Sequence, residues 1–196
     1  MFDLRLWKEV LTKPKETFKK ERKNASLGNA AKNFFVASII SALMVLVSSY
    51  TNPEMSVLPE FWEYMIVLLI PISVLASFAM SGIYYVIARL LDGKGNYATQ
   101  TWLMSVYTVP ITLISSLITL IPYVDLLSIF VGLYSLYLLT LSFKETHKFN
   151  TGRAIMTWII PFMLIIVVAA IIASFAVSYF MSSLSLEELA NLTTSI

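Results

Sequence analysis

The longest apolar run of the sequence, residues 61–91, is the feature that most limits how this chain can fold. A helix rises 1.5 Å per residue, so a helix over this run would be about 46 Å long, whereas the hydrocarbon core of a bilayer is about 30 Å thick. Such a helix has to cross a membrane and tilt, extend past the surface or bend. Pro71 is the predicted position of a bend, because proline has no backbone N–H and clashes with the preceding turn.

Further apolar runs along the chain are also long enough for membrane spans. The predicted spans are residues 33–50, 61–91, 101–121, 126–143 and 154–181. The chain is 58% hydrophobic and 13% charged, whereas a soluble domain is closer to half apolar and a quarter charged. The sequence therefore predicts an all-α, polytopic membrane protein with five transmembrane helices.

The predicted organisation is a cytosolic segment at 1–32, a membrane domain at 33–181 and a short external tail at 182–196. The N-terminal segment has no apolar run of the kind found in a cleavable signal peptide. Its apolar residues have helical spacing, and they are Leu4, Trp7, Val10 and Leu11. A basic stretch that begins near Pro14 follows them. This pattern is typical of an amphipathic helix that lies in the membrane interface and binds anionic headgroups, and a solvated charged helix is the alternative.

The basic residues predict the orientation in the membrane. With the N-terminus inside, the inner segments 1–32, 89–100 and 144–153 contain all fourteen Lys and Arg residues of the chain. The charged residues of the outer segments are then all acidic, so five spans satisfy the positive-inside rule and four spans break it. The predicted contacts to lipid headgroups or partners are Trp7, Lys15, Lys19, Lys20, Arg22, Lys23, Arg89, Lys94, Lys148 and Arg153.

Few residues of the sequence could carry out chemistry. No charged side chain lies well inside a predicted span, which argues against a proton- or sodium-coupled transporter. There is no cysteine, and His147 stands alone in a predicted surface loop, where we expect no functional role. We therefore expect no catalytic, cofactor-binding, metal-binding or nucleic-acid-binding site, and no enzyme activity.

The segment Gly93-Lys94-Gly95 is not a phosphate-binding loop, because that motif needs Gly-x4-Gly-Lys-Ser/Thr after a strand. We interpret it as a tight turn after a helix, with Gly93 in the left-handed conformation and Lys94 at the headgroups.

The predicted third span contains many hydroxyl groups, at Thr108, Thr112, Ser115, Ser116 and Thr119. Together with small-residue pairs such as Ser128 and Gly132, they favour close helix packing. The packing could be internal to the bundle, or it could form a dimer face or a polar groove. A small channel, transporter or lipid-moving protein is therefore the alternative to a structural or interaction protein.

Four stretches of the sequence resemble the Yip family, membrane proteins first known as partners of Ypt/Rab small GTPases. They are LWKEVLTKPKETF, YYVIARLLDGKGNY, VYTVPITLISSLITLIPYVD and GLYSLYLLTLSFKETHKFNTGRA. The residues that carry the resemblance include Trp7, Leu11, Pro14, Thr17, Phe18, Tyr85, Leu90, Gly93, Gly95, Pro110, Pro122, Gly132, Tyr134, His147, Arg153 and Ala154.

The resemblance implies five membrane helices, a cytosolic N-terminus and self- or hetero-association, with no known enzymatic reaction. In eukaryotes it implies a role in vesicle trafficking and organelle shape. The sequence has no long N-terminal extension like that of the eukaryotic trafficking members, so we do not count small-GTPase binding among the expected functions. The chain is more similar to a bacterial or archaeal member, which implies a prokaryotic plasma membrane.

Overall fold

The computed structural model describes residues 3–51, 62–121 and 125–183. These residues form helices joined by short connections, with no strand among them, which confirms the all-α class. In chain order the helices are α1 (Leu4–Thr12), α2 (Pro14–Glu21), the 3-10 turn η1 (Arg22–Asn24), α3 (Leu27–Thr51), α4 (Trp62–Leu90), α5 (Tyr97–Thr119), α6 (Asp125–His147) and α7 (Thr151–Ser183). The motif residue Pro122 and the tail beyond Ser183 lie outside the described residues.

Among the described residues, five helices, α3 to α7, are long and apolar enough to cross a membrane, as predicted. Several of their boundaries differ from the prediction, and two of these differences bear on the site. Helix α3 begins at Leu27, because Ser26 accepts hydrogen bonds from the backbone N–H groups of Asn29 and Ala30 and so starts the helix before the apolar run. Helix α6 continues to His147, so its last turn is polar.

The chain divides into two compact units, residues 1–158 and residues 159–196. The second unit contains the remainder of α7, which is free of charged residues as far as Ser183. The first unit contains α1 to α6 and the first turns of α7, and all features described below lie in it.

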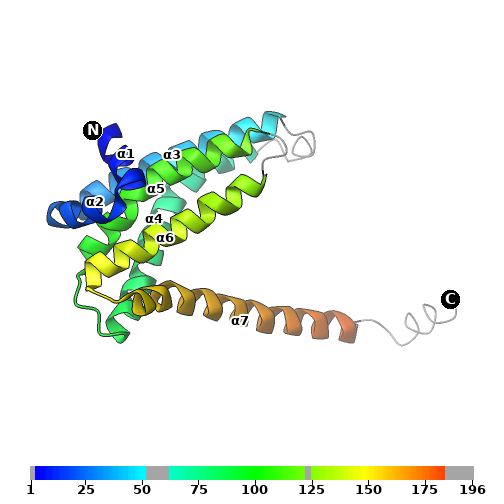
Figure 1. Ribbon diagram of the computed structural model, residues 1–196. Helices are drawn as coiled ribbons and strands as arrows, with labels where there is room; N and C mark the ends of the chain where they lie inside the picture. Colours follow the sequence, from blue (N-terminus) through cyan, green and yellow to red (C-terminus); the bar gives the residue numbers. More distant parts are fainter. Residues whose placement is uncertain (1–2, 52–61, 122–124, 184–196) are drawn as a thin grey trace. The chain divides into compact units, whose positions relative to one another are not determined.

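Helix α5 is the central element of the first unit, since it packs against α1, α3, α4 and α6 (Figure 1). Its side chains are buried almost continuously from Thr99 to Pro110. Pro110 lies inside the helix, and Pro71 likewise lies inside α4, which continues on both sides of it.

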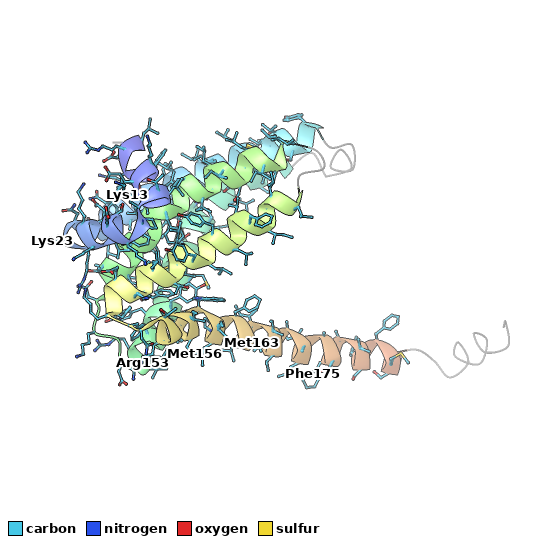
Figure 2. All side chains as sticks on the ribbon, viewed as in Figure 1. Lys13, Lys23, Arg153, Met156, Met163 and Phe175 are labelled. Atoms are coloured by element: carbon cyan, nitrogen blue, oxygen red, sulfur yellow. The ribbon has the colours of Figure 1, made fainter. Side chains whose placement is uncertain are left out.

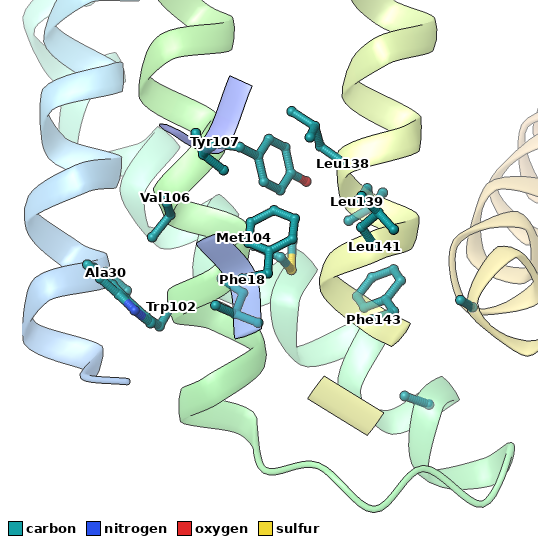
Figure 3. Close-up of a cluster of buried hydrophobic side chains, with 14 of the residues drawn as sticks. Phe18, Ala30, Trp102, Met104, Val106, Tyr107, Leu138, Leu139, Leu141 and Phe143 are labelled. Carbon is teal, nitrogen blue, oxygen red and sulfur yellow. The ribbon is translucent and has the colours of Figure 1, made fainter. Parts of the chain in front are cut away.

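The core lies between α5, α6 and the N-terminal helices (Figure 3). Phe18 of α2 is fully buried and meets the Tyr107 ring edge-on, with the ring centroids 6.2 Å apart. Leu138 and Phe143 of α6 are also fully buried in this cluster. Helix α2 is therefore packed against the membrane helices through the buried Phe18 side chain.

Helices α1 and α2, which we call the N-terminal hairpin, are held by two side chains of the membrane helices. Trp102 Nε1 of α5 donates to the backbone oxygen of Glu21 at 3.0 Å, and the Tyr134 hydroxyl of α6 donates to the backbone oxygen of Leu11 at 2.5 Å. Val10, the centre of the predicted lipid-facing stripe, is fully buried against the protein. Helix α1 is amphipathic as predicted, but Val10 on its apolar face is buried against the chain's own bundle, with Leu6 and Leu11 partly buried beside it.

Candidate functional site

The basic residues of the chain lie on the elements that meet at one end of the first unit, which we call the basic end (Figure 2). The elements are the N-terminal hairpin, the start of α3, the end of α4 with its loop to α5, the end of α6 with its loop to α7, and the start of α7. Two polar contacts show that these helix ends adjoin: Asn33 of α3 donates to Ser105 Oγ of α5 at 3.3 Å, and His147 of α6 contacts Gln100 of α5 at 2.8 Å.

The buried His147 fixes the geometry of this end. Its Nδ1 accepts the backbone N–H of Gly95 at 3.2 Å, so the ring proton is on Nε2, which donates to Gln100 Oε1 at 2.8 Å. The amide nitrogen of Gln100 in turn donates to the backbone oxygen of Ser81 at 2.6 Å. This chain of bonds joins α6, the α4–α5 loop, α5 and α4. The prediction that His147 lies in a surface loop was wrong, because α6 extends to this residue and brings its ring, buried, under the α4–α5 loop.

The loop after α4 closes in a Schellman arrangement. The backbone N–H of Gly93 donates to the Ala88 oxygen at 2.8 Å and that of Asp92 to the Arg89 oxygen at 3.2 Å. The left-handed residue is Asp92, with φ 64°, so the prediction that Gly93 takes this conformation was wrong by one position.

Gly93 and Gly95 allow the α4–α5 loop to approach the end of α6 closely. A Cβ on Gly93 would lie 2.6 Å from both the Ala88 oxygen and His147 Nδ1. A Cβ on Gly95 would lie 2.5 Å from the backbone oxygen of Thr146. The two glycines therefore allow the loop to lie directly against the end of α6.

Three of the predicted contact residues, Lys94, Lys148 and Arg153, line one cleft of about 380 Å³ that we call the basic cleft. Its other lining residues are Asp92, His147, Phe149 and Asn150. The ion pairs around it are long and exposed: Arg153 to Asp92 is 3.7 Å and Lys148 to Glu145 is 3.8 Å. Pairs of this kind contribute little, so these cations can turn to an anionic group without a large loss. The arrangement suits a phosphate-sized anion.

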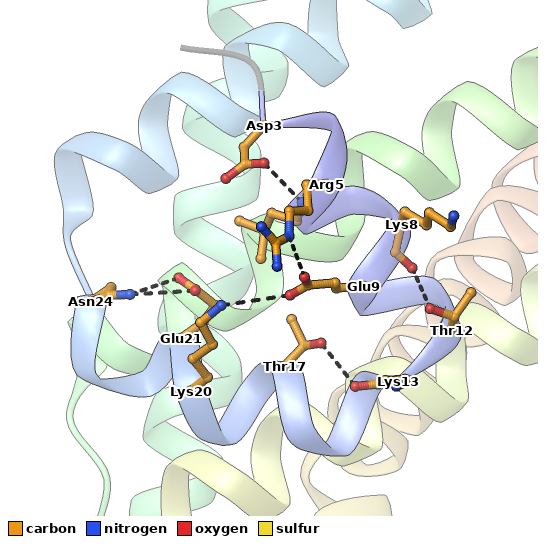
Figure 4. A network of polar contacts seen from close by, with 11 residues as sticks. Asp3, Arg5, Lys8, Glu9, Thr12, Lys13, Thr17, Lys20, Glu21 and Asn24 are labelled. Atoms are coloured by element: carbon orange, nitrogen blue, oxygen red, sulfur yellow. Dashed lines mark hydrogen bonds and ion pairs between the residues drawn. The ribbon is translucent and has the colours of Figure 1, made fainter.

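The other predicted contact residues are not part of this cleft. Lys15, Lys19 and Lys23 are exposed on α2 and η1, and Lys20 pairs with Glu9 of α1 at 3.7 Å (Figure 4). Arg89 donates to the Gly93 oxygen at 2.9 Å and so supports the loop. Trp7 and Arg22 are only partly exposed, and Trp7 lines a second cleft beside α3.

The remaining motif residues have different roles. Pro14 is the first residue of α2, where its missing N–H costs nothing. Pro110 is buried inside α5. A Cβ on Gly132 would meet nothing within 4 Å beyond its own helix, so the described part of the chain does not use this glycine for close packing.

Sequence reasoning missed Gln100 and Ser81, which complete the network around His147. The signal in the sequence was the glutamine itself, four residues after Asn96 and just before an apolar run, because a polar side chain that is buried there needs a partner. The structure shows that Gln100 is fully buried.

A family model described as the Yip1 domain matches residues 8–172 of the chain. No curated protein and no solved structure matches it.

Proposed function

The chain belongs to the Yip family of multi-pass membrane proteins, and from that premise we propose that it is a non-enzymatic protein that organises the membrane or recruits protein partners through its basic end. We place the basic end in the cytosol of a prokaryotic cell, because cytosolic loops carry the excess of Lys and Arg. In this orientation it faces the anionic inner leaflet of the plasma membrane.

The observation that carries the proposal is the basic cleft. Lys94 and Lys148 come from two loops, and the His147 network holds the first loop against the end of α6. Arg153, at the start of α7, pairs with Asp92 of the first loop at 3.7 Å. Each basic residue near an anionic surface contributes about 1 kcal/mol of attraction. Three such residues around one cleft attract the same anionic headgroup together, whereas lysines that are spread over the surface attract different headgroups.

The test uses the full chain in vesicles of phosphatidylcholine that contain a spin-labelled lipid. We expect spin-labelled phosphatidylglycerol to be enriched at the protein boundary over spin-labelled phosphatidylcholine, with less enrichment at high salt. Replacing Lys94, Lys148 and Arg153 together by Gln should lower this enrichment more than replacing Lys15, Lys19 and Lys23, which lie outside the cleft. An equal fall in both triple variants would mean that total charge, and not the cleft, attracts the lipid.

Association with a second copy or with other membrane proteins is part of the proposal. It is tested by counting photobleaching steps of the labelled chain in vesicles at low protein density. A single step at every density would remove self-association from the proposal.

One observation favours a second candidate function, a transporter or lipid-moving protein. A cleft of about 470 Å³ lies between α3 and α5 and is lined by Ser41, Ser48 and several hydroxyls of α5: Thr112, Ser115, Ser116 and Thr119. Met44, Val45 and Ile111 complete its lining, so the groove is mainly apolar with a set of hydroxyl groups along it. Polar groups along a groove in an apolar bundle are a feature that a path for headgroups or solutes requires. Lipid scrambling or solute flux above that of empty vesicles would support this function, and rates equal to those of empty vesicles would count against it.

A further inference from the structure

A second cleft, of about 530 Å³, lies between the N-terminal hairpin, the start of α3 and α5, and we call it the hairpin cleft. It is lined by Asp3, Leu6, Trp7, Glu21, Asn24, Asn29, Lys32, Asn33, Phe35, Val36 and Trp102. Its volume is in the range of small-ligand sites. Unlike the basic cleft, it contains two carboxylates and a single lysine.

Glu21 is the residue that defines what the hairpin cleft can bind. It is 7% exposed, and within the described part of the chain its carboxylate accepts only from the Asn24 amide, at 3.3 and 3.4 Å. No described cation lies within 4.0 Å of it, although it is surrounded by basic residues in sequence. The nearby cations Arg5 and Lys20 pair instead with Glu9, at 2.9 and 3.7 Å (Figure 4). Because a buried charge is normally paired, Glu21 leaves a position for a cation from outside the chain.

The groups around Glu21 favour a cation that donates hydrogen bonds. The Asp3 carboxylate accepts from the N–H of Leu6 at 3.0 Å and has further acceptor capacity. The oxygen of the Asn33 side chain accepts from no described residue, while its nitrogen donates to Ser105 Oγ at 3.3 Å. A primary ammonium has three N–H donors for such acceptors, whereas a quaternary ammonium has none. The indole rings of Trp7 and Trp102 add faces that attract either kind of cation.

The other side of the hairpin cleft is apolar and belongs to a membrane helix. Phe35 and Val36 lie in the candidate span Leu27–Ser48, and Phe35 is 51% exposed. Lys32 lies three and four residues before them, on the same part of the helix. An occupant that meets both sides has a cationic headgroup, an anionic group for Lys32 and an apolar tail.

We propose that the hairpin cleft binds a phospholipid with a primary ammonium headgroup, of the phosphatidylethanolamine class. Glu21 and Asp3 hold the ammonium, Lys32 holds the phosphate, and the acyl chains continue past Phe35 and Val36 into the bilayer. The proposal requires that the chain is a membrane protein, and it does not depend on the basic cleft or on the orientation in the membrane.

The test is a titration of the full chain in an uncharged detergent with dioctanoyl lipids, followed by tryptophan fluorescence and by native mass spectrometry. We expect phosphatidylethanolamine to bind about tenfold more tightly than phosphatidylcholine, because only the former donates charge-assisted hydrogen bonds to Glu21. Mono- and dimethylated headgroups should fall between the two. Glycerophosphoethanolamine, which lacks the tails, should bind more weakly than the lipid, and equal binding would identify a soluble amine as the ligand and overturn the lipid assignment.

The variants separate the two charged ends of the headgroup. Glu21→Gln should remove the preference for phosphatidylethanolamine over phosphatidylcholine, while Glu16→Gln, on the exposed side of α2 and outside the cleft, should retain it. Lys32→Gln should weaken both lipids by the same factor, because both carry the phosphate.

Equal binding of the two zwitterionic lipids to the unsubstituted chain would overturn the proposal even if Glu21→Gln does not fold. Tighter binding of phosphatidylglycerol than of phosphatidylethanolamine would also overturn it. Neither result would affect the basic cleft, whose test varies other residues and another lipid.

Discussion

The two halves of α5 differ in whether their polar side chains also bond to other helices. In the half at the basic end, residues 97–110, some polar groups bond to other helices: Gln100 to Ser81 and His147, and Thr101 to Ser81 at 2.7 Å. Thr108 of this half donates to its own helix, at the Met104 oxygen. In the other half, residues 111–119, the hydroxyls line the open cleft beside α3, and Thr119 bonds to its own helix at Ser116. The same residue types therefore join helices in one half and leave a groove in the other.

The difference follows from what faces each half. The basic half is covered by the hairpin, by α6 and by the α4–α5 loop, and a polar group buried there without a partner would cost about 1–3 kcal/mol. The far half is only partly covered, so its hydroxyls lie at the edge of a cleft and need no partner on another helix. We expect substitutions to be costly in the first half and mild in the second.

The largest effect is expected from Gly95→Ala. The new methyl group would lie 2.5 Å from the Thr146 oxygen and Cγ2, which forces the loop away from α6 and breaks the bond from Gly95 to His147. We expect a loss of about 3–5 kcal/mol in the free energy of unfolding, from overpacking and from the lost bond. Thermal unfolding in detergent measures it. The control is Gly132→Ala, where nothing lies within 4 Å of the new atom, and an equal loss in both variants would contradict the close-approach argument.

A smaller loss is expected from His147→Leu. The substitution leaves the N–H of Gly95 and Oε1 of Gln100 buried without their partner, which should cost about 2–3 kcal/mol. A double-mutant cycle with Gln100→Leu provides the measurement. The double variant should lose less than the sum of the single losses, and strictly additive losses would show that the two side chains do not interact.

The smallest effect is expected from Ser115→Ala in the far half. Ser115 lines the groove and makes no hydrogen bond with its side chain among the described residues, so the change in unfolding free energy should stay below about 0.5 kcal/mol. Ser81→Ala is the matched variant at the basic end, where the hydroxyl contacts Thr101 at 2.7 Å, and it should cost more. Equal effects of the two serine variants would erase the contrast between the halves.

Much of the fold could be predicted from the sequence, because the length of an apolar run is itself a physical requirement for crossing a bilayer. The helix ends were less predictable. Hydropathy marks where apolar residues begin, whereas α3 begins at a cap beside Ser26 and α6 ends with a polar turn. The prediction for Gly93 was wrong by one residue because it depended on where α4 ends. A Schellman turn needs one left-handed residue, and here that residue is Asp92.

The site was predictable only as a set of residue types. Lys94, Lys148 and Arg153 stand out as loop cations, but their presence in one cleft depends on bonds between distant segments. The stripe around Val10 has the same spacing whether it faces lipid or protein, and only the position of α5 and α6 decides between them. The burial of His147 and its bond to Gln100 could not be predicted from hydropathy, because a single polar residue has no periodicity.

The way in which Trp102 and Tyr134 hold the hairpin has a consequence for how this surface can evolve. Both side chains bind carbonyl groups of the main chain, which every amino acid provides. The exposed residues of α1 and α2 can therefore be substituted without loss of these two hydrogen bonds, as long as Val10, Phe18 and the helical geometry remain. A recognition sequence for a new binding protein could be grafted onto Lys15, Lys19 and their neighbours while the bundle beneath stays as it is.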